Sequence, residues 1–157
     1  MLGRHPYLSR WHWEGREEGE IAEDALHAVD LDGFEGRDVL TLSGGERQRV
    51  ALAALLAQDA PLLLLDEPVS HLDLHHQILV LAHLRELARD RGKGVLFTVH
   101  DLNLAVRFAT HALLLTPEGV VQQGPIDEVM DEAALWCAFG HRVTRVEAAG
   151  RTLFVPE

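Results

Sequence analysis

Two short apolar runs, separated by one long amphipathic pattern, constrain the fold of this chain most. The first run, residues 62–65, is wholly leucine and lies between two prolines, and the second covers residues 95–99. Short apolar runs bounded by turn residues are typical of buried parallel strands. Between them, residues 74–91 predict a helix whose inward residues are Leu74, Ile78, Leu81, Leu84 and Leu87. The pattern therefore predicts a right-handed βαβ unit.

The rest of the chain is also predicted to consist of helices and short strands joined by loops. Helical spacing predicts a helix over 17–29, a loop over 30–42, and a second helix after Ser43. Ser43 and Glu46 have the spacing of a capping box, in which each side chain bonds the backbone of the other. Beyond the second apolar run we expect a helix over 102–109 and a strand over 111–115 that pairs with 120–123. Two short helices over 126–130 and 133–139 should follow. The chain should end in a hairpin of 142–146 with 152–155.

Charge and composition exclude several classes of protein. Lys and Arg total 14 against 25 Asp and Glu, so the net charge of −11 argues against a general nucleic-acid binder. No apolar run approaches the roughly 18 residues that span a bilayer, and the first residues lack the apolar core of a signal peptide. The single cysteine, Cys137, suits a reducing compartment.

The basic residues are thirteen arginines and one lysine. A P-loop needs a lysine after a glycine-rich turn, because that lysine reaches the nucleotide phosphates. Lys93 is the only candidate, but it is followed by Gly94 rather than by Ser or Thr. These 157 residues therefore contain no P-loop.

Polar side chains follow both apolar runs. Asp66 and Glu67 come directly after the first, and His100 comes directly after the second. Since ligands of open α/β sheets bind at the carboxyl ends of strands, Asp66 is suited to hold Mg²⁺ and Glu67 to deprotonate a water. An imidazole at the same edge can bond a phosphate oxygen. The alternatives are an acidic loop after a core strand and a structural histidine.

The segment Ser43-Gly44-Gly45 opens the second predicted helix. Glycines at a helix start let the backbone approach an anion closely, and the N–H groups and helix dipole favour phosphate there. A helix that is simply well capped is the alternative interpretation.

These features together resemble the ATPase subunits of ABC transporters. Residues 42–50, LSGGERQRV, resemble the signature motif, and residues 62–68, LLLLDEP, resemble the Walker B motif. Residues 70–73 are similar to the D-loop and residues 98–101 to the H-loop. The resemblance implies an α/β, P-loop NTPase-like fold: a three-layer, mostly parallel sheet with a helical subdomain, whose N-terminal part is missing here.

Within that family the chain resembles the importers of iron siderophores, haem and cobalamin. Residues 3–7, GRHPY, resemble the segment that opens the helical subdomain in these ATPases, and residues 100–105 and 124–129 are also typical of the group. The ending after residue 140 resembles the cobalamin branch in particular.

The resemblance implies a role for each motif residue. Glu67 is the general base, Asp66 binds Mg²⁺ and His100 contacts the γ-phosphate of ATP. The signature residues that approach the ATP of the opposite subunit are Ser43, Gly44, Gly45 and Gln48, and Asp73 acts across the same dimer interface.

The implied partners are a second ATPase subunit, transmembrane permease subunits and, indirectly, a substrate-binding protein, without nucleic acid. The implied location is the cytoplasmic face of the cell membrane, where the arginine-rich residues 4–16 would meet the permease. A solvated surface stretch is the alternative for residues 4–16.

The chain departs from the family pattern in two respects. Walker A and the Q-loop are absent, so the 157 residues resemble a C-terminal fragment that is inactive alone. His71 replaces a small D-loop residue, and with His75 it has the spacing of a metal pair on a helix, although two polar residues at a helix start are the simpler interpretation.

We expect three segments: 1–58 as the helical subdomain, 59–124 as the C-terminal part of the catalytic core, and 125–157 as terminal helices and hairpin. The alternative functions are a truncated docking or dimerisation module that hydrolyses no ATP, and a soluble ABC protein of DNA repair or translation.

Overall fold

The computed structural model describes residues 16–116, 119 and 121–157. The chain divides into two units, Met1–Thr98 and Val99–Glu157, and each is considered separately. The predictions for residues 1–15, and for the turn at 117 and 118, lie outside the described residues. Among the described helices, none has the length and apolar character needed to cross a bilayer.

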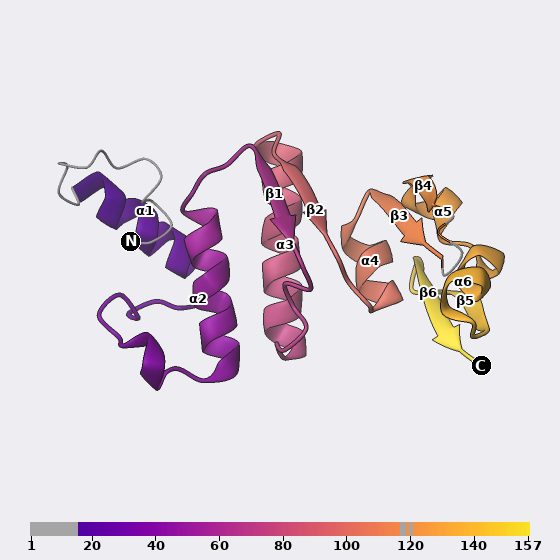
Figure 1. The fold of residues 1–157 in the computed structure, drawn as a ribbon, viewed down its shortest axis with the longest axis horizontal. Coiled ribbons are helices and arrows are strands. Elements are labelled where there is room, and N and C mark those ends of the chain that lie inside the picture. The colour runs from indigo at the N-terminus through magenta and orange to yellow at the C-terminus, as the bar shows by residue number, and fades with distance from the viewer. Residues whose placement is uncertain (1–15, 117–118, 120) are drawn as a thin grey trace. The chain divides into compact units, whose positions relative to one another are not determined.

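The first unit begins with two helices in contact, α1 (Arg16–His27) and α2 (Gly44–Leu56) (Figure 1). They confirm the two predicted helices. The loop between them contains one short 3-10 turn, η2 (Val39–Thr41), which Asp38 caps by accepting the Leu40 N–H at 2.9 Å. The C-terminal ends of α1 and α2 are followed by residues with positive φ, Asp30 and Asp59, which turn the chain away.

The predicted βαβ unit is present in the first unit. Strand β1 (Leu62–Leu65) pairs in parallel with β2 (Gly94–Phe97), and α3 (Leu74–Asp90) connects them (Figure 1). The register aligns Leu65 with Phe97, so both strands end at the same edge. Strand β2 ends two residues earlier than the apolar run indicated. Continued by one residue, the register that pairs Leu65 with Phe97 places Thr98 opposite Asp66.

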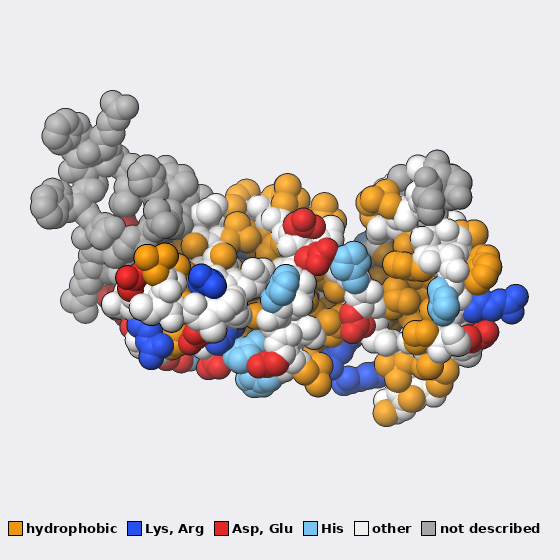
Figure 2. Space-filling model, turned by 60° about the horizontal axis from the view of Figure 1, so that its bottom comes forward, with side chains coloured by type: hydrophobic (Ala, Val, Ile, Leu, Met, Phe, Trp, Pro, Cys, Tyr) orange, Lys and Arg blue, Asp and Glu red, His pale blue; other side chains and the backbone are white. Residues whose placement is uncertain are grey.

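The prediction that both strands are wholly buried is wrong. Their side chains alternate, and Leu62, Leu64 and Leu96 are 55%, 63% and 58% exposed. The physical reason is that β1 and β2 pair only with each other among the described strands, and that α3 is the helix in contact with β2. Hydrophobic side chains therefore reach the surface (Figure 2).

Helix α3 buries the expected face except at its start. Leu74 is 67% exposed, because it lies in the first turn of the helix and the buried stripe begins only at Val80. Val80, Leu81, Leu84 and Leu87 form that stripe. Gly92, at φ 63°, allows the chain to turn back toward β2.

Lys93, the one lysine of the chain, makes contacts that stabilise the fold. Lys93 Nζ lies 2.6 Å from Asp59 Oδ1 and 2.9 Å from the Ala60 carbonyl oxygen, and its side chain is only 12% exposed. It therefore ties the residue before β2 to the residues before β1.

The second unit contains two antiparallel pairs. Helix α4 (Leu102–Phe108) leads into β3 (His111–Leu115), which pairs with β4 (Val121–Pro125). Helices α5 (Ile126–Val129) and α6 (Glu132–Phe139) follow, and β5 (Val143–Ala148) pairs with β6 (Arg151–Pro156). These elements confirm the predicted order.

A shared core joins the elements of the second unit. Leu135 is fully buried, and it packs with residues from β3, α5 and the terminal hairpin. The buried members are Leu114, Ile126, Val129, Met130, Ala134, Leu135, Val143 and Phe154. Asn103 fastens α4 to this hairpin, since its amide accepts the Phe154 N–H at 2.7 Å and donates to the Phe154 carbonyl oxygen at 3.2 Å.

The expected three-layer, mostly parallel sheet is represented among the described strands by one parallel pair, β1 and β2. The other two sheets are antiparallel pairs. The division at residues 58 and 124 stays a prediction.

Candidate functional site

The turn after β1 places the two predicted acidic residues at the carboxyl end of the strand. Asp66 is exposed and Glu67 is half-buried. Glu67 has φ 44°, a left-handed conformation that is uncommon for a residue with a side chain. Its N–H donates to Thr98 Oγ1 at 2.8 Å, and its carbonyl oxygen accepts from the Ser70 N–H at 3.2 Å. Both backbone polar groups of Glu67 are therefore held.

The same hydroxyl reaches the preceding carboxylate. Thr98 Oγ1 donates to Asp66 Oδ1 at 2.7 Å. The sequence places Thr98 only in the H-loop resemblance and does not predict its contact with Asp66 and Glu67. The parallel register could have indicated it, because a hydroxyl residue just beyond β2 faces the residues just beyond β1.

Two helices anchor the rest of this turn. Gln48 of α2 donates through Nε2 to the Pro68 carbonyl oxygen at 3.3 Å, and Gln77 of α3 donates through Nε2 to the Val69 carbonyl oxygen at 3.3 Å. Pro68 and Val69 themselves are buried. The turn that carries Glu67 is thus fixed from both sides.

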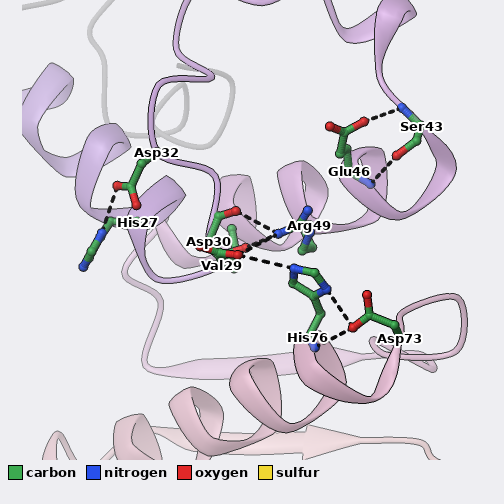
Figure 3. Close-up of polar contacts among 9 residues, drawn as sticks. All are labelled: His27, Val29, Asp30, Asp32, Ser43, Glu46, Arg49, Asp73 and His76. Atoms are coloured by element: carbon green, nitrogen blue, oxygen red, sulfur yellow. Dashed lines mark hydrogen bonds and ion pairs between the residues drawn. The ribbon is translucent and has the colours of Figure 1, made fainter.

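The signature segment forms the start of α2 as a complete capping box (Figure 3). Ser43 Oγ accepts the Glu46 N–H at 3.3 Å, and Glu46 Oε2 accepts the Ser43 N–H at 2.7 Å. Hydrogen bonding to the side chain and backbone of Ser43 holds the pKa of the Glu46 carboxyl below its ordinary value. The capping prediction is confirmed.

The capping box does not bond all the backbone N–H groups in the first turn of α2. The first N–H groups of an α-helix have no partner within the helix. At this helix start they belong to Gly44 and Gly45, of which Gly44 is exposed. A Cβ on Gly45 would lie 3.7 Å from the His71 carbonyl oxygen, so the helix start runs close to the D-loop residues.

Asp73 is the N-cap of α3. Its Oδ1 accepts the His76 N–H at 3.0 Å and lies 2.8 Å from His76 Nδ1. The backbone hydrogen bond from His76, together with the imidazole, lowers the pKa of the Asp73 carboxyl. Asp73 therefore has a structural role inside the subunit beside its predicted role at the interface.

A polar cluster joins α3 to the segments around α1 and α2 (Figure 3). His76 Nε2 lies 3.4 Å from Asp30 Oδ2. Arg49 Nη1 donates to the carbonyl oxygens of Val29 at 3.1 Å and Asp30 at 2.8 Å. No sequence pattern predicts this cluster, because its residues come together only when three separate segments pack against one another.

His100 lies in the second unit. It is exposed and precedes Asp101, which caps α4 by accepting the N–H groups of Asn103 at 2.8 Å and Leu104 at 3.1 Å. The chain direction after His100 is therefore set by a well-formed helix start.

The histidines of the D-loop region have partners of their own. His71 Nδ1 lies 2.9 Å from Ser70 Oγ, and the His75 ring meets the His76 ring edge-on with centroids 5.2 Å apart. Within the described part of the chain, no three or more His, Cys, Asp or Glu residues are grouped to hold a metal ion.

The donor set at Asp66 nevertheless fits Mg²⁺ bound together with a nucleotide. Mg²⁺ commonly takes one or two carboxylates and completes its coordination with water and substrate phosphates. The exposed Asp66 carboxylate, with Oδ1 already oriented by Thr98, is such a ligand.

Comparison with known proteins gives a consistent family. The ABC transporter family model matches residues 4–70. The achromobactin transport ATP-binding protein CbrD of Dickeya dadantii is 45% identical over 139 residues, 88% of this chain and 51% of that protein. The hemin import ATP-binding protein HmuV of Burkholderia pseudomallei is 43% identical over 158 residues, 94% of this chain and 58% of that protein.

Solved structures agree with these relatives. A transporter described as of the metal-chelate ABC type, in an inward-facing conformation, has a TM-score of 0.86 at 29% identity over 99% of this chain and 63% of its own. The dimeric bacterial ABC transporter cassette MJ0796 has a TM-score of 0.68 at 31% identity, covering 77% of this chain and 52% of its own. The chain spans about half the length of the curated relatives it matches.

Proposed function

Because the chain belongs to the ABC transporter family of ATP-binding proteins, we propose that it is part of an ATPase subunit that drives import of an iron complex or cobalamin. The relatives named for achromobactin, hemin and cobalamin support this substrate range. The observation that carries the proposal is the turn after β1, where Thr98 Oγ1 bonds both the Asp66 carboxylate and the Glu67 backbone N–H at the carboxyl ends of a parallel pair of strands.

Asp66 is the residue of this chain that would hold Mg²⁺. The ion supplies charge neutralisation on the β- and γ-phosphates of ATP. Thr98 orients Oδ1 of Asp66. The resemblance assigns His100 to a γ-phosphate oxygen, to which an imidazole N–H can donate.

Glu67 is the general base of the proposed hydrolysis. Its carboxylate accepts a proton from the attacking water, while the water oxygen bonds the γ-phosphorus and the bond to the ADP oxygen breaks. A fixed backbone at Glu67 favours this role, because general-base catalysis depends on position.

The start of α2 serves the ATP of a second subunit in this proposal. The hydroxyl of Ser43 and the N–H groups of Gly44 and Gly45 are directed to the γ-phosphate, which the positive end of the helix favours. Gln48 holds this helix to the Walker B turn, and Asp73 lies at the dimer interface.

The partners follow from the same family membership. We propose a head-to-tail dimer with a second ATPase subunit, attached to permease subunits on the cytoplasmic face of the membrane and served indirectly by a substrate-binding protein. No nucleic-acid partner is proposed, which agrees with the net charge of −11.

Uptake by cells of the source organism tests this function. Deletion of the gene should abolish uptake of ferric siderophore, hemin or cobalamin, and the unchanged gene should restore it. Glu67→Gln should not restore uptake, whereas the matched control Glu86→Gln, exposed on α3, should. If deletion leaves uptake of all three substrates unchanged, the proposal fails.

A further inference from the structure

One hydroxyl group contacts both acidic residues of the Walker B turn. Thr98 Oγ1 donates its proton to Asp66 Oδ1 at 2.7 Å and accepts the Glu67 N–H at 2.8 Å. A hydroxyl has one donor and two acceptor sites, so these bonds use the donor and fix its direction. Since the Asp66 acceptor is a charged oxygen, its bond is of the stronger, charge-assisted kind.

The backbone of Thr98 is held independently of its side chain. The Thr98 N–H donates to the Leu65 carbonyl oxygen at 3.0 Å, which continues the parallel pairing of β1 and β2 by one residue. The hydroxyl therefore projects from a fixed strand end. The Thr98 hydroxyl can therefore hold the neighbouring turn in one position.

The backbone of Glu67 needs hydrogen bonds of this kind to keep its conformation. Its φ of 44° lies in the left-handed region, which is unfavourable for residues with a side chain. The Glu67 N–H bond to Thr98 and the Glu67 carbonyl bonds to Ser70 hold the residue there. Without Thr98, the Glu67 N–H would lose its acceptor and Asp66 Oδ1 would lose its donor.

We propose that Thr98 is a positioning residue for ATP hydrolysis, which aligns the Asp66 carboxylate for Mg²⁺ and holds the Glu67 backbone in its left-handed conformation. This inference rests on the proposed function. Thr98 touches neither nucleotide nor water in this role and acts through Asp66 and Glu67. A merely structural Thr98 would stabilise the strand end without changing turnover.

Three variants separate these roles. Thr98→Val keeps the shape and removes the hydroxyl, Thr98→Ser keeps the hydroxyl and removes the methyl group, and Thr98→Ala is a second variant without a hydroxyl. Thr144→Val is the matched control, because Thr144 Oγ1 likewise donates to a carboxylate, that of Glu157 at 2.9 Å, but within the terminal hairpin of the second unit.

The first measurement is steady-state ATP hydrolysis by the protein that carries these residues together with a complete nucleotide site. Thr98→Val and Thr98→Ala should lower kcat by about 10-fold to 100-fold, the usual cost of removing a hydrogen-bond partner of a metal-binding carboxylate. The KM for ATP should stay within about twofold, because the lost contact orients groups used in the reaction. Thr98→Ser and Thr144→Val should keep the parent kcat.

The second measurement is hydrogen exchange of the Glu67 amide, which needs no nucleotide. Thr98→Val should speed this exchange by about tenfold, the size expected for one lost hydrogen bond, and Thr98→Ser should not. Parent-like kcat in Thr98→Val, or unchanged Glu67 exchange, would overturn the inference. A parent protein that hydrolyses no ATP would instead overturn the proposed function.

Discussion

At the scale of single residues, Glu67 combines an uncommon backbone conformation with a carboxylate that we propose as the general base. Left-handed residues other than glycine persist only where their surroundings hold them, and they gather at functional sites. Here the holding groups are Thr98 on one side and Ser70 on the other. These bonds hold the backbone of the residue that we propose as the general base.

Motif spacing alone identified Asp66, Glu67 and His100 as candidates, because polar residues directly after apolar runs are visible in the sequence. The conformation of Glu67 and the role of Thr98 were not predictable in the same way. They depend on the register between β1 and β2, which is set by packing over many residues. Asp73 shows the same limit, since its bond to the His76 ring follows only from the start of α3.

His100 is predicted to act on turnover more than on binding. In the protein with a complete nucleotide site, His100→Ala should lower kcat by about 10²-fold, as loss of one transition-state hydrogen bond does. ATP affinity should change by less than about threefold. His141→Ala, in an exposed loop, is the control. Parent-like kcat in His100→Ala would return His100 to a structural role.

Glu46 is predicted to contribute to acid sensitivity. Its folded-state pKa lies below the ordinary value of 4.5, so its stabilising contribution is complete above that pH and is lost as the pH falls through the folded-state pKa. Glu46→Gln can still fill the capping box but carries no charge. Unfolding curves should therefore show a smaller loss of stability in Glu46→Gln than in the parent between about pH 5 and pH 2. Equal losses would contradict this.

At the scale of elements, the boundaries of helices and turns were predicted well, because they depend on residues that are neighbours in the sequence. The capping residue Ser43, the helix-ending Gly92 and the Ala149-Gly150 turn each lie where the sequence placed a boundary. The exposed faces of β1 and β2 do not follow from the leucine run itself, because such a run does not reveal which strands and helices cover it.

The terminal hairpin offers a test of its turn. Ala149 and Gly150 connect β5 and β6 with φ of 51° and 71°, the pattern of a type I′ turn, which favours Asn-Gly. Ala149→Asn should raise the free energy of unfolding by about 0.5–1 kcal/mol, because alanine is strained at positive φ. Thermal unfolding measures this. Gly150→Ala should be destabilising, and stabilisation by Gly150→Ala would contradict the turn assignment.

At the scale of the whole molecule, the 157 residues carry the carboxylates and the signature segment but no P-loop. A P-loop supplies the N–H groups and the lysine that hold the β- and γ-phosphates. The family and its α/β fold followed from the order of motifs, whereas the separation into two units came only from the structure.

A protein made of these 157 residues alone is predicted to bind MgATP no more tightly than about 1 mM and to hydrolyse none. It should also associate, because Leu62, Leu64 and Leu96 expose apolar surface on paired strands with open edges. Titration calorimetry and size-exclusion chromatography measure both properties. Micromolar affinity in a monomer would mean that the nucleotide site has been misplaced.

Glu67 is proposed as the base that activates water for ATP hydrolysis, and a paired measurement of phosphate release and nucleotide binding decides this role. Phosphate release and nucleotide binding are followed in the protein with a complete nucleotide site, for the parent and for Glu67→Gln. The amide keeps the shape of the side chain but accepts no proton, so ATP affinity should be unchanged while kcat falls by about 10²-fold or more. Phosphate release by Glu67→Gln within a few-fold of the parent would contradict the role of Glu67.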